Sequence, residues 1–158
     1  ETAFPPGTSI EVRDLFFNLP ARRKFLRSDR SELTRITKSL TETVLARPDV
    51  RFVLTHKNRE IFSLPAVRTL KERIFQLFGR KTTDSLMDVD YEEGEHRITG
   101  FASRPPSGRG DRAHQYFFIN ARPVKDRTVQ AALTQAFRGF LEKDRYPECF
   151  LFLEVPFG

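Results

Sequence analysis

The sequence predicts an α+β fold, in which helices and β-hairpins follow one another along a chain of 158 residues. Three observations support this class. Apolar residues recur at helical spacing in separate segments, alternating or wholly apolar runs mark several strands, and Gly, Pro and Asn stand between them. With 39% hydrophobic and 12% aromatic residues, the chain can bury a core.

The first segments read as a strand, a turn and two helices. Residues 10–17 are apolar enough for a strand, which Asn18-Leu19-Pro20 ends, and Pro20 suits the first turn of a helix. A longer helix follows, with an N-cap at Asp29. Its end is at Arg47, since the residue before a proline avoids helical geometry. One buried stripe of this helix is formed by Leu33, Ile36, Leu40 and Val44.

A hairpin and a second helix are expected next. Strands at residues 50–54 and 60–64 are joined by a turn at Lys57-Asn58. The helix spans residues 70–78, and Gly79 closes it.

A second hairpin precedes an irregular loop. Its strands are residues 86–91 and 97–102. Residues 103–112 show no periodicity and are rich in Gly, Pro and Arg, so we expect a mobile loop there.

The last elements are a strand, a helix and a strand. Residues 115–120 form the first strand, and Asp126 caps a helix whose apolar face runs from Val129 to Leu141. The final strand contains Cys149, the only cysteine, which is expected to be a buried apolar residue without a disulfide.

The net charge of +6 is distributed unevenly. Residues 22–30 hold five basic residues against one acidic residue, and residues 97–127 hold seven against two. Residues 83–96 hold six acidic residues and neither Lys nor Arg. This asymmetry indicates an anion-facing side, as in a nucleic-acid binder, although mixed solvated charges produce similar runs.

No catalytic or metal-binding constellation stands out in the sequence. The three histidines, His56, His96 and His114, lie far apart without other ligands at metal-binding spacing, so we expect them to be structural. No phosphate-binding glycine motif is present, and we expect no enzyme activity from this chain alone. Apolar runs are much shorter than the roughly 20 residues of a membrane-spanning helix. We therefore expect an intracellular protein, cytoplasmic if bacterial, without a membrane partner.

Two motifs resemble the MutL family of DNA mismatch repair proteins. The first is Gly7-Thr8 followed by Asn18-Leu19-Pro20-Ala21-Arg22-Arg23-Lys24-Phe25-Leu26, and the second runs from Tyr116 to Arg127. The resemblance covers nearly the whole chain. It implies that residues 1–66 are the C-terminal part of a GHKL ATPase domain. Residues 67–158 would be most of a transducer domain, ribosomal-protein domain-2-like, with a left-handed βαβ crossover.

The resemblance also implies a function for the intact protein. It would be an ATPase that uses ATP and Mg, dimerises, and binds the DNA backbone without sequence specificity. It would couple mismatch recognition by a MutS-type protein to strand removal. The family's active-site lysine would follow Gly158, and this chain alone is expected to bind no cofactor.

Specific residues carry these roles in the resemblance. Thr8 helps to hold the adenine of ATP, and DNA contacts fall on Lys24 and Arg127, with Arg22, Arg23, Arg27 and Lys125 beside them. The residues alone leave alternatives open. Lys24 also suits a solvated helix face, and Arg127 a salt bridge with Asp126. One departure is Thr41-Glu42, where the family can carry a basic residue, so the DNA surface is either weaker here or depends on Lys38 and Arg35.

Two other functions fit parts of the sequence. The transducer of another GHKL machine, such as a type II topoisomerase, is disfavoured by the run from Asn18 to Phe25. A protein-interaction module without DNA binding would use Phe-rich surfaces. Salt-dependent DNA binding distinguishes the last possibility from the others.

Overall fold

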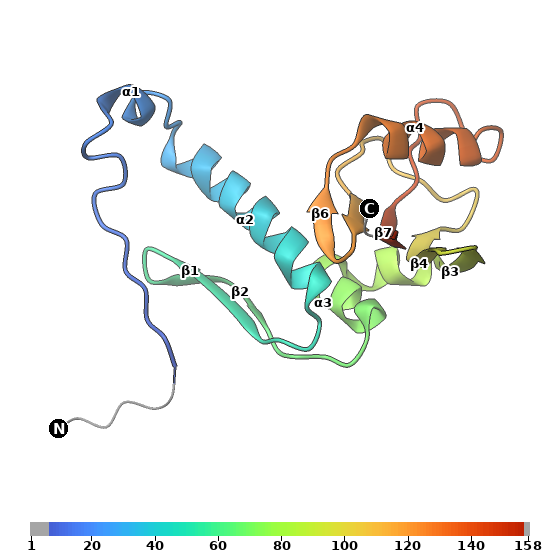
Figure 1. Cartoon of the computed structure of the whole chain (residues 1–158), viewed down its shortest axis with the longest axis horizontal. Coiled ribbons are helices and arrows are strands. Elements are labelled where there is room, and N and C mark those ends of the chain that lie inside the picture. Colours follow the sequence, from blue (N-terminus) through green and yellow to red (C-terminus); the bar gives the residue numbers. More distant parts are fainter. Residues whose placement is uncertain (1–6, 157–158) are drawn as a thin grey trace. The chain divides into compact units, whose positions relative to one another are not determined.

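The computed structural model describes residues 7–156. The chain divides into two compact units between Thr37 and Lys38, a boundary that lies within one helix (Figure 1). A domain boundary near residue 66 stays a prediction. In the part of the chain described, no helix is both long and apolar enough to cross a bilayer.

The predicted α+β class is confirmed. The helices are α1 (Pro20–Arg23), α2 (Asp29–Ala46), α3 (Leu70–Asp84) and α4 (Arg127–Ala136). The strands are β1 (Phe52–His56), β2 (Arg59–Leu64), β3 (Leu86–Glu93), β4 (His96–Ser103), β5 (Gln115–Ile119), β6 (Arg122–Val124) and β7 (Cys149–Glu154).

The strand expected at residues 10–17 is not formed. Residues 7–13 are irregular, and the Phe17 amide donates to the Asp14 carbonyl at 2.8 Å to close a turn. A strand needs a neighbour for its backbone groups, and no described residue pairs with this segment. Ile10 is accordingly 83% exposed.

Helix α2 begins at Asp29, one residue earlier than an N-cap at Asp29 implies, and is buried only near its C-terminal end. Ser28 caps it, because its hydroxyl accepts a 3.4 Å hydrogen bond from the Ser31 amide. The expected stripe is wrong at Ile36, which is 53% exposed, whereas Val44 and Leu45 are completely buried. The apolar spacing gave the helix correctly but could not tell which turns are covered.

The first hairpin is confirmed. Strands β1 and β2 pair antiparallel, and Lys57 and Asn58 form the turn with positive φ angles. Helix α3 then begins with a capping box between Thr69 and Glu72. Gly79 interrupts α3 at φ 77° as expected, but one more helical turn follows it.

A five-stranded sheet in the order β3-β4-β7-β5-β6 organises the second unit. Strands β3, β4 and β7 are antiparallel neighbours, whereas β5 and β7 are parallel and are connected through α4. Strand β6 was not expected, and a turn at Asn120-Ala121 joins it to β5. Gly100 is required in β4, because a Cβ atom there would collide with the carbonyl oxygen of Phe150.

Apolar clusters cover both faces of this sheet. One face packs against α2 and α3 through six buried residues, Leu45, Ile74, Leu86, Tyr116, Phe118 and Phe150. The other packs against α4 through Ala102, Phe117, Leu133 and Cys149. Burial raises the pKa of Cys149 to about 12, as expected for an inert buried thiol.

Helix α4 is shorter than its apolar pattern suggests. It is capped by Asp126 as expected but ends at Ala136, and Gly139 adopts φ 84° shortly afterwards. Phe137 is partly buried against the sheet, but Phe140 is 62% exposed. Because the chain leaves the helical path at Gly139, Phe140 does not lie on the face where continued helical periodicity would place it.

Arg73 of α3 is a completely buried arginine. Its Nη2 atom donates to the carbonyl oxygens of Pro48 at 2.8 Å and Val50 at 2.6 Å. Its Nη1 atom donates to Gln76 Oε1 at 2.8 Å. The two bonds to Pro48 and Val50 thus fix the chain between α2 and β1 to α3, and the bond to Gln76 orients the guanidinium group within α3.

We predict that Arg73→Met lowers the free energy of unfolding by about 2–4 kcal/mol, because it removes the hydrogen bonds from Arg73 to the carbonyl oxygens of Pro48 and Val50. The Pro48 oxygen would keep its bond from the Val67 amide at 2.8 Å. Chemical denaturation measures the loss. Arg68→Met, which removes an exposed charge just before α3, is the control and should stay within about 0.5 kcal/mol. Equal losses in the two variants would contradict the assigned role of Arg73.

Candidate nucleic-acid interface

Four of the predicted DNA-binding residues lie in the first unit. Arg22 and Arg23 belong to α1, Lys24 caps its C-terminal end, and Arg27 follows in the turn before α2. All four side chains are exposed. None of them forms an ion pair with another residue of the described segment 7–156, so their charges are available to an external anion.

Arg127 occupies the first residue of α4 in the second unit. The neighbouring Asp126 accepts hydrogen bonds from the amides of Thr128 at 2.8 Å and Val129 at 3.0 Å. The hydrogen bond from the Val129 amide and then that from the Thr128 amide lower the pKa of Asp126 and outweigh the opposing effect of desolvation. Asp126 is therefore the cap of α4, as expected, and it occupies the amides of Thr128 and Val129. Arg127 remains exposed, and no described carboxylate pairs with it.

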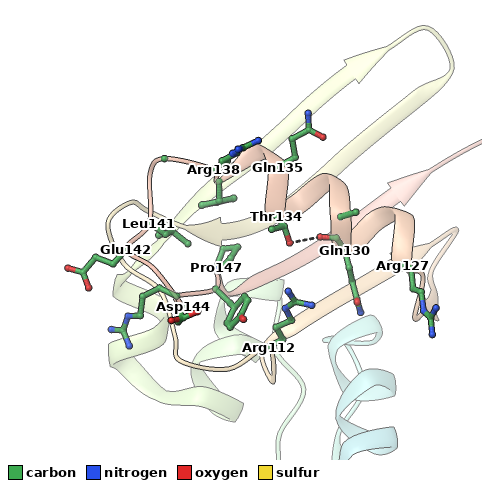
Figure 2. A pocket seen from close by; sticks show the side chains of 15 residues that line it. Arg112, Arg127, Gln130, Thr134, Gln135, Arg138, Leu141, Glu142, Asp144 and Pro147 are labelled. Carbon is green, nitrogen blue, oxygen red and sulfur yellow. Dashed lines mark hydrogen bonds between the residues drawn. The ribbon is translucent and has the colours of Figure 1, made fainter.

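A hollow of about 950 Å³ lies beside α4 (Figure 2). Four arginines line it against two carboxylates, those of Glu142 and Asp144. The arginines are Arg112, Arg127, Arg138 and Arg145. The excess of guanidinium groups favours a polyanion over a neutral ligand.

Lys125 is the predicted site residue whose charge is already paired. Its Nζ atom lies 3.1 Å from Glu42 Oε1. Both residues line a second, smaller hollow, together with Lys38. Where the family can carry a basic residue, this chain has Glu42, and its carboxylate pairs with Lys125, a predicted DNA contact. Arg35, the other suggested substitute, lies 3.7 Å from Glu32.

Sequence reasoning did not assign Arg112 to the site. It lies in the Arg-rich loop after β4 and lines both hollows. Its guanidinium carbon lies 4.5 Å from the ring centroid of Tyr146, 34 positions away in the sequence numbering. The excess of basic residues in the loop was visible, but nothing in the sequence distinguished Arg112 from its neighbours.

Known proteins that are similar to this chain are DNA mismatch repair proteins. A family model described as "DNA mismatch repair protein, C-terminal domain" matches residues 74–158. DNA mismatch repair protein MutL of Symbiobacterium thermophilum is 41% identical over 98% of this chain and 24% of its own length. MutL of Geotalea daltonii is 40% identical over 95% of this chain and 25% of its own length.

This chain belongs to the MutL family of DNA mismatch repair proteins. It spans about a quarter of the length of the curated relatives it matches. A solved structure, the Aquifex aeolicus MutL ATPase domain complexed with ADP, is 32% identical with a TM-score of 0.69. That match covers 92% of this chain and 51% of the other.

The nucleotide contact expected in this MutL-family chain is Thr8. It lies in the irregular segment before α1 and is exposed. Among residues 7–156, no group of three or more His, Cys, Asp or Glu side chains is placed to hold a metal ion.

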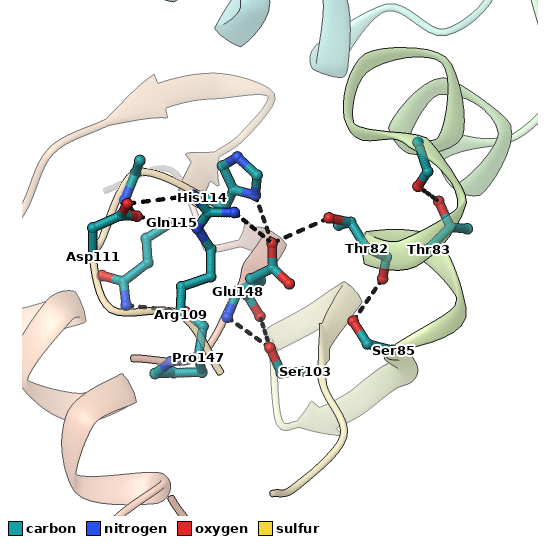
Figure 3. Close-up of polar contacts among 12 residues, drawn as sticks. Thr82, Thr83, Ser85, Ser103, Arg109, Asp111, His114, Gln115, Pro147 and Glu148 are labelled. Carbon is teal, nitrogen blue, oxygen red and sulfur yellow. Dashed lines mark hydrogen bonds and ion pairs between the residues drawn. The ribbon is translucent and has the colours of Figure 1, made fainter. Parts of the chain in front are cut away.

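A buried polar cluster centred on Glu148 lies just before β7 (Figure 3). Its Oε1 atom lies 2.5 Å from His114 Nδ1, accepts a hydrogen bond from Thr82 Oγ1 at 3.3 Å, and lies 3.8 Å from Arg109. The Glu148 amide donates to Ser103 Oγ at 2.7 Å. The cluster connects α3, β4 and the loop before β5, and the structural role expected for His114 is confirmed.

Burial raises the pKa of Glu148, but the hydrogen bond and charge of His114, together with the charge of Arg109, outweigh it. The pKa therefore lies below its ordinary value of 4.5. A carboxylate with a lowered folded-state pKa stabilises the fold above its unfolded-state pKa. That contribution is lost as the pH falls through the folded-state pKa.

We predict that Glu148→Gln loses stability at pH 7 and shows a flatter dependence of the free energy of unfolding on pH below about 4.5. Urea denaturation at several pH values measures both effects. Other carboxylates, such as Asp111, also titrate in this range, so the informative quantity is the difference between parent and variant. A difference that does not change between pH 7 and pH 3 would contradict the charged role of Glu148.

Proposed function

We propose that this chain is the DNA-contacting part of an ATP-dependent MutL protein that couples recognition of a mismatch by a MutS-type protein to strand removal. The family membership supports this role. The observation that carries the DNA-binding part is that Lys24 in the first unit and Arg127 in the second are exposed and form no ion pair with any residue of the described range 7–156. We place the protein inside the cell, where its DNA substrate is found.

The contacts proposed are phosphate contacts without base specificity. Lys and Arg side chains neutralise backbone phosphates and position a protein on DNA without reading sequence. Lys24 and Arg127 are the principal contacts. Arg22, Arg23 and Arg27 add positive charge near Lys24, and Lys125 adds positive charge near Arg127 only when its ion pair with Glu42 opens.

ATP and Mg are proposed as cofactors of the intact protein, in which ATP drives formation of a homodimer. The ADP complex of the Aquifex aeolicus ATPase domain supports nucleotide binding by the relatives. In this chain Thr8 is the residue proposed to contact adenine. Residues 1–66 are proposed to complete the ATPase domain, and residues 67–158 to form most of the transducer domain.

We predict that Lys24→Glu and Arg127→Glu each weaken binding of this chain to duplex and single-stranded DNA regardless of sequence. The neutral variant Lys24→Ala should reduce the slope of log K against log salt by about 0.7–0.9, the effect of one lost phosphate contact. Fluorescence anisotropy over a range of salt concentrations measures both quantities.

The fold should survive these changes because both side chains are exposed, and circular dichroism checks this. In the intact protein the same changes should impair DNA-stimulated ATPase and leave basal ATPase largely intact. If the folded variants bind DNA as the parent does at every salt concentration, the DNA-binding proposal fails. A protein-interaction module would then be the better description.

A second prediction concerns nucleotide. This chain alone should show no micromolar affinity for ATP, because Thr8 cannot replace the phosphate and Mg contacts that such sites require. Isothermal titration calorimetry with Mg-ATP tests this. Tight binding would mean that residues outside the resemblance hold the triphosphate.

A further inference from the structure

We propose that Arg112 is a further phosphate contact of the second unit, and that Glu42 limits the DNA affinity of this surface by holding Lys125. This inference rests on the proposed DNA-binding function. It concerns only residues of the unit that begins at Lys38.

The position of Arg112 connects the two hollows of this surface. Arg112 and Gln130 line both the hollow that contains Arg127 and the hollow that contains Lys38 and Lys125. In Figure 2 the side chain of Gln130 lies between those of Arg112 and Arg127. A phosphate backbone that contacts Arg127 and continues toward Lys38 would therefore pass Arg112.

Arg112 is oriented without being neutralised. Its guanidinium group lies 4.5 Å from the centroid of the Tyr146 ring, in cation–π contact. No carboxylate within residues 7–156 forms an ion pair with it. The ring restricts the side chain but leaves its full charge and its planar set of N–H donors, which suit a phosphate. Restricting a side chain in advance lowers the entropic cost of binding.

Another arginine of the same loop shows the contrast. Arg109 donates to both carboxylate oxygens of Asp111, at 3.1 and 3.3 Å, and lies 3.8 Å from Glu148. The hydrogen bonds from Arg109 lower the pKa of Asp111 to about 2. The charge of Arg109 is thus paired with carboxylates of the protein, whereas that of Arg112 is paired with no carboxylate of residues 7–156.

Glu42 has the opposite effect on the same surface. Its side chain is only 14% exposed, and its Oε1 atom lies 3.1 Å from Lys125 Nζ. The Lys125 side chain is 70% exposed, so solvent screens the pair in part and its strength is that of a surface ion pair. Glu42 therefore reduces the positive charge that Lys125 offers to DNA, and its own carboxylate repels phosphate in the hollow that also contains Lys38.

The test for Arg112 is DNA binding by the 158-residue chain, measured by anisotropy with a short fluorescent duplex. Arg112→Gln should weaken binding about threefold to tenfold at low salt and reduce the slope of log K against log salt by about 0.7–0.9. The matched control is Arg80→Gln, since Arg80 pairs with Asp84 at 3.2 Å and lines neither hollow. It removes the same charge and should change binding less than twofold, within about 0.4 kcal/mol.

The test for Glu42 is a double-mutant cycle with Lys125. Glu42→Gln should strengthen DNA binding about threefold, because it releases Lys125. Lys125→Gln should change binding little in the parent but should weaken it about threefold in the Glu42→Gln background. Thermal melts of each variant establish that the nearly isosteric changes leave the fold intact.

The outcomes separate this inference from the proposed function. If Lys24→Glu and Arg127→Glu weaken binding but Arg112→Gln behaves like Arg80→Gln, the role of Arg112 is wrong and the proposed function stands. If Lys125→Gln has the same effect in both backgrounds, the role of Glu42 is wrong. If none of the basic substitutions affects binding, the proposed function itself fails.

Discussion

The pairing of β7 with a strand on each side is the constraint on which the second unit depends. Strand β7 is antiparallel to β4 and parallel to β5, and its residues Cys149 and Phe150 are completely buried. A parallel pair cannot be closed by a tight turn, so the chain must leave the sheet between β5 and β7. That crossover contains α4, and it brings Arg127 and Tyr146 to one hollow.

The same constraint explains why polar groups are buried at the start of β7. Glu148 immediately precedes the strand and is buried, as are Cys149 and Phe150 at the start of the strand. A buried carboxylate is costly unless it is paired and hydrogen-bonded. Thr82 of α3, together with Arg109 and His114 of the loop between β4 and β5, meets that requirement. The cluster therefore stabilises the irregular loop before β5, on which Arg112 stands.

The positive charge that the proposed DNA surface offers depends on which of its basic residues already form ion pairs within the protein. Arg109 is paired by Asp111 and Lys125 by Glu42, while Arg112 and Arg127 remain unpaired among the described residues. Net charge alone would count these four residues equally. The distinction matters because only an unpaired cation releases counterions from DNA without first breaking an ion pair.

The sequence by itself determined the class of fold, most element boundaries and the family. Local signals were sufficient where the cause is local: Pro48 ends α2, Asp126 caps α4, and the Lys57-Asn58 turn closes the first hairpin. The basic run near Lys24 was equally visible. The MutL resemblance suggested Lys24 and Arg127, whose side chains are exposed in the structure.

Only the tertiary structure decided which apolar residues are covered and which charges are free. Residues 10–17 have the composition of a strand but pair with no strand in the described part of the chain, and Phe140 has the spacing of a core residue but is exposed. The contact of Arg112 with Tyr146 and the pairing of Lys125 with Glu42 join residues far apart in the chain. Sequence periodicity describes one element at a time, whereas burial and ion pairing depend on what the fold places against it.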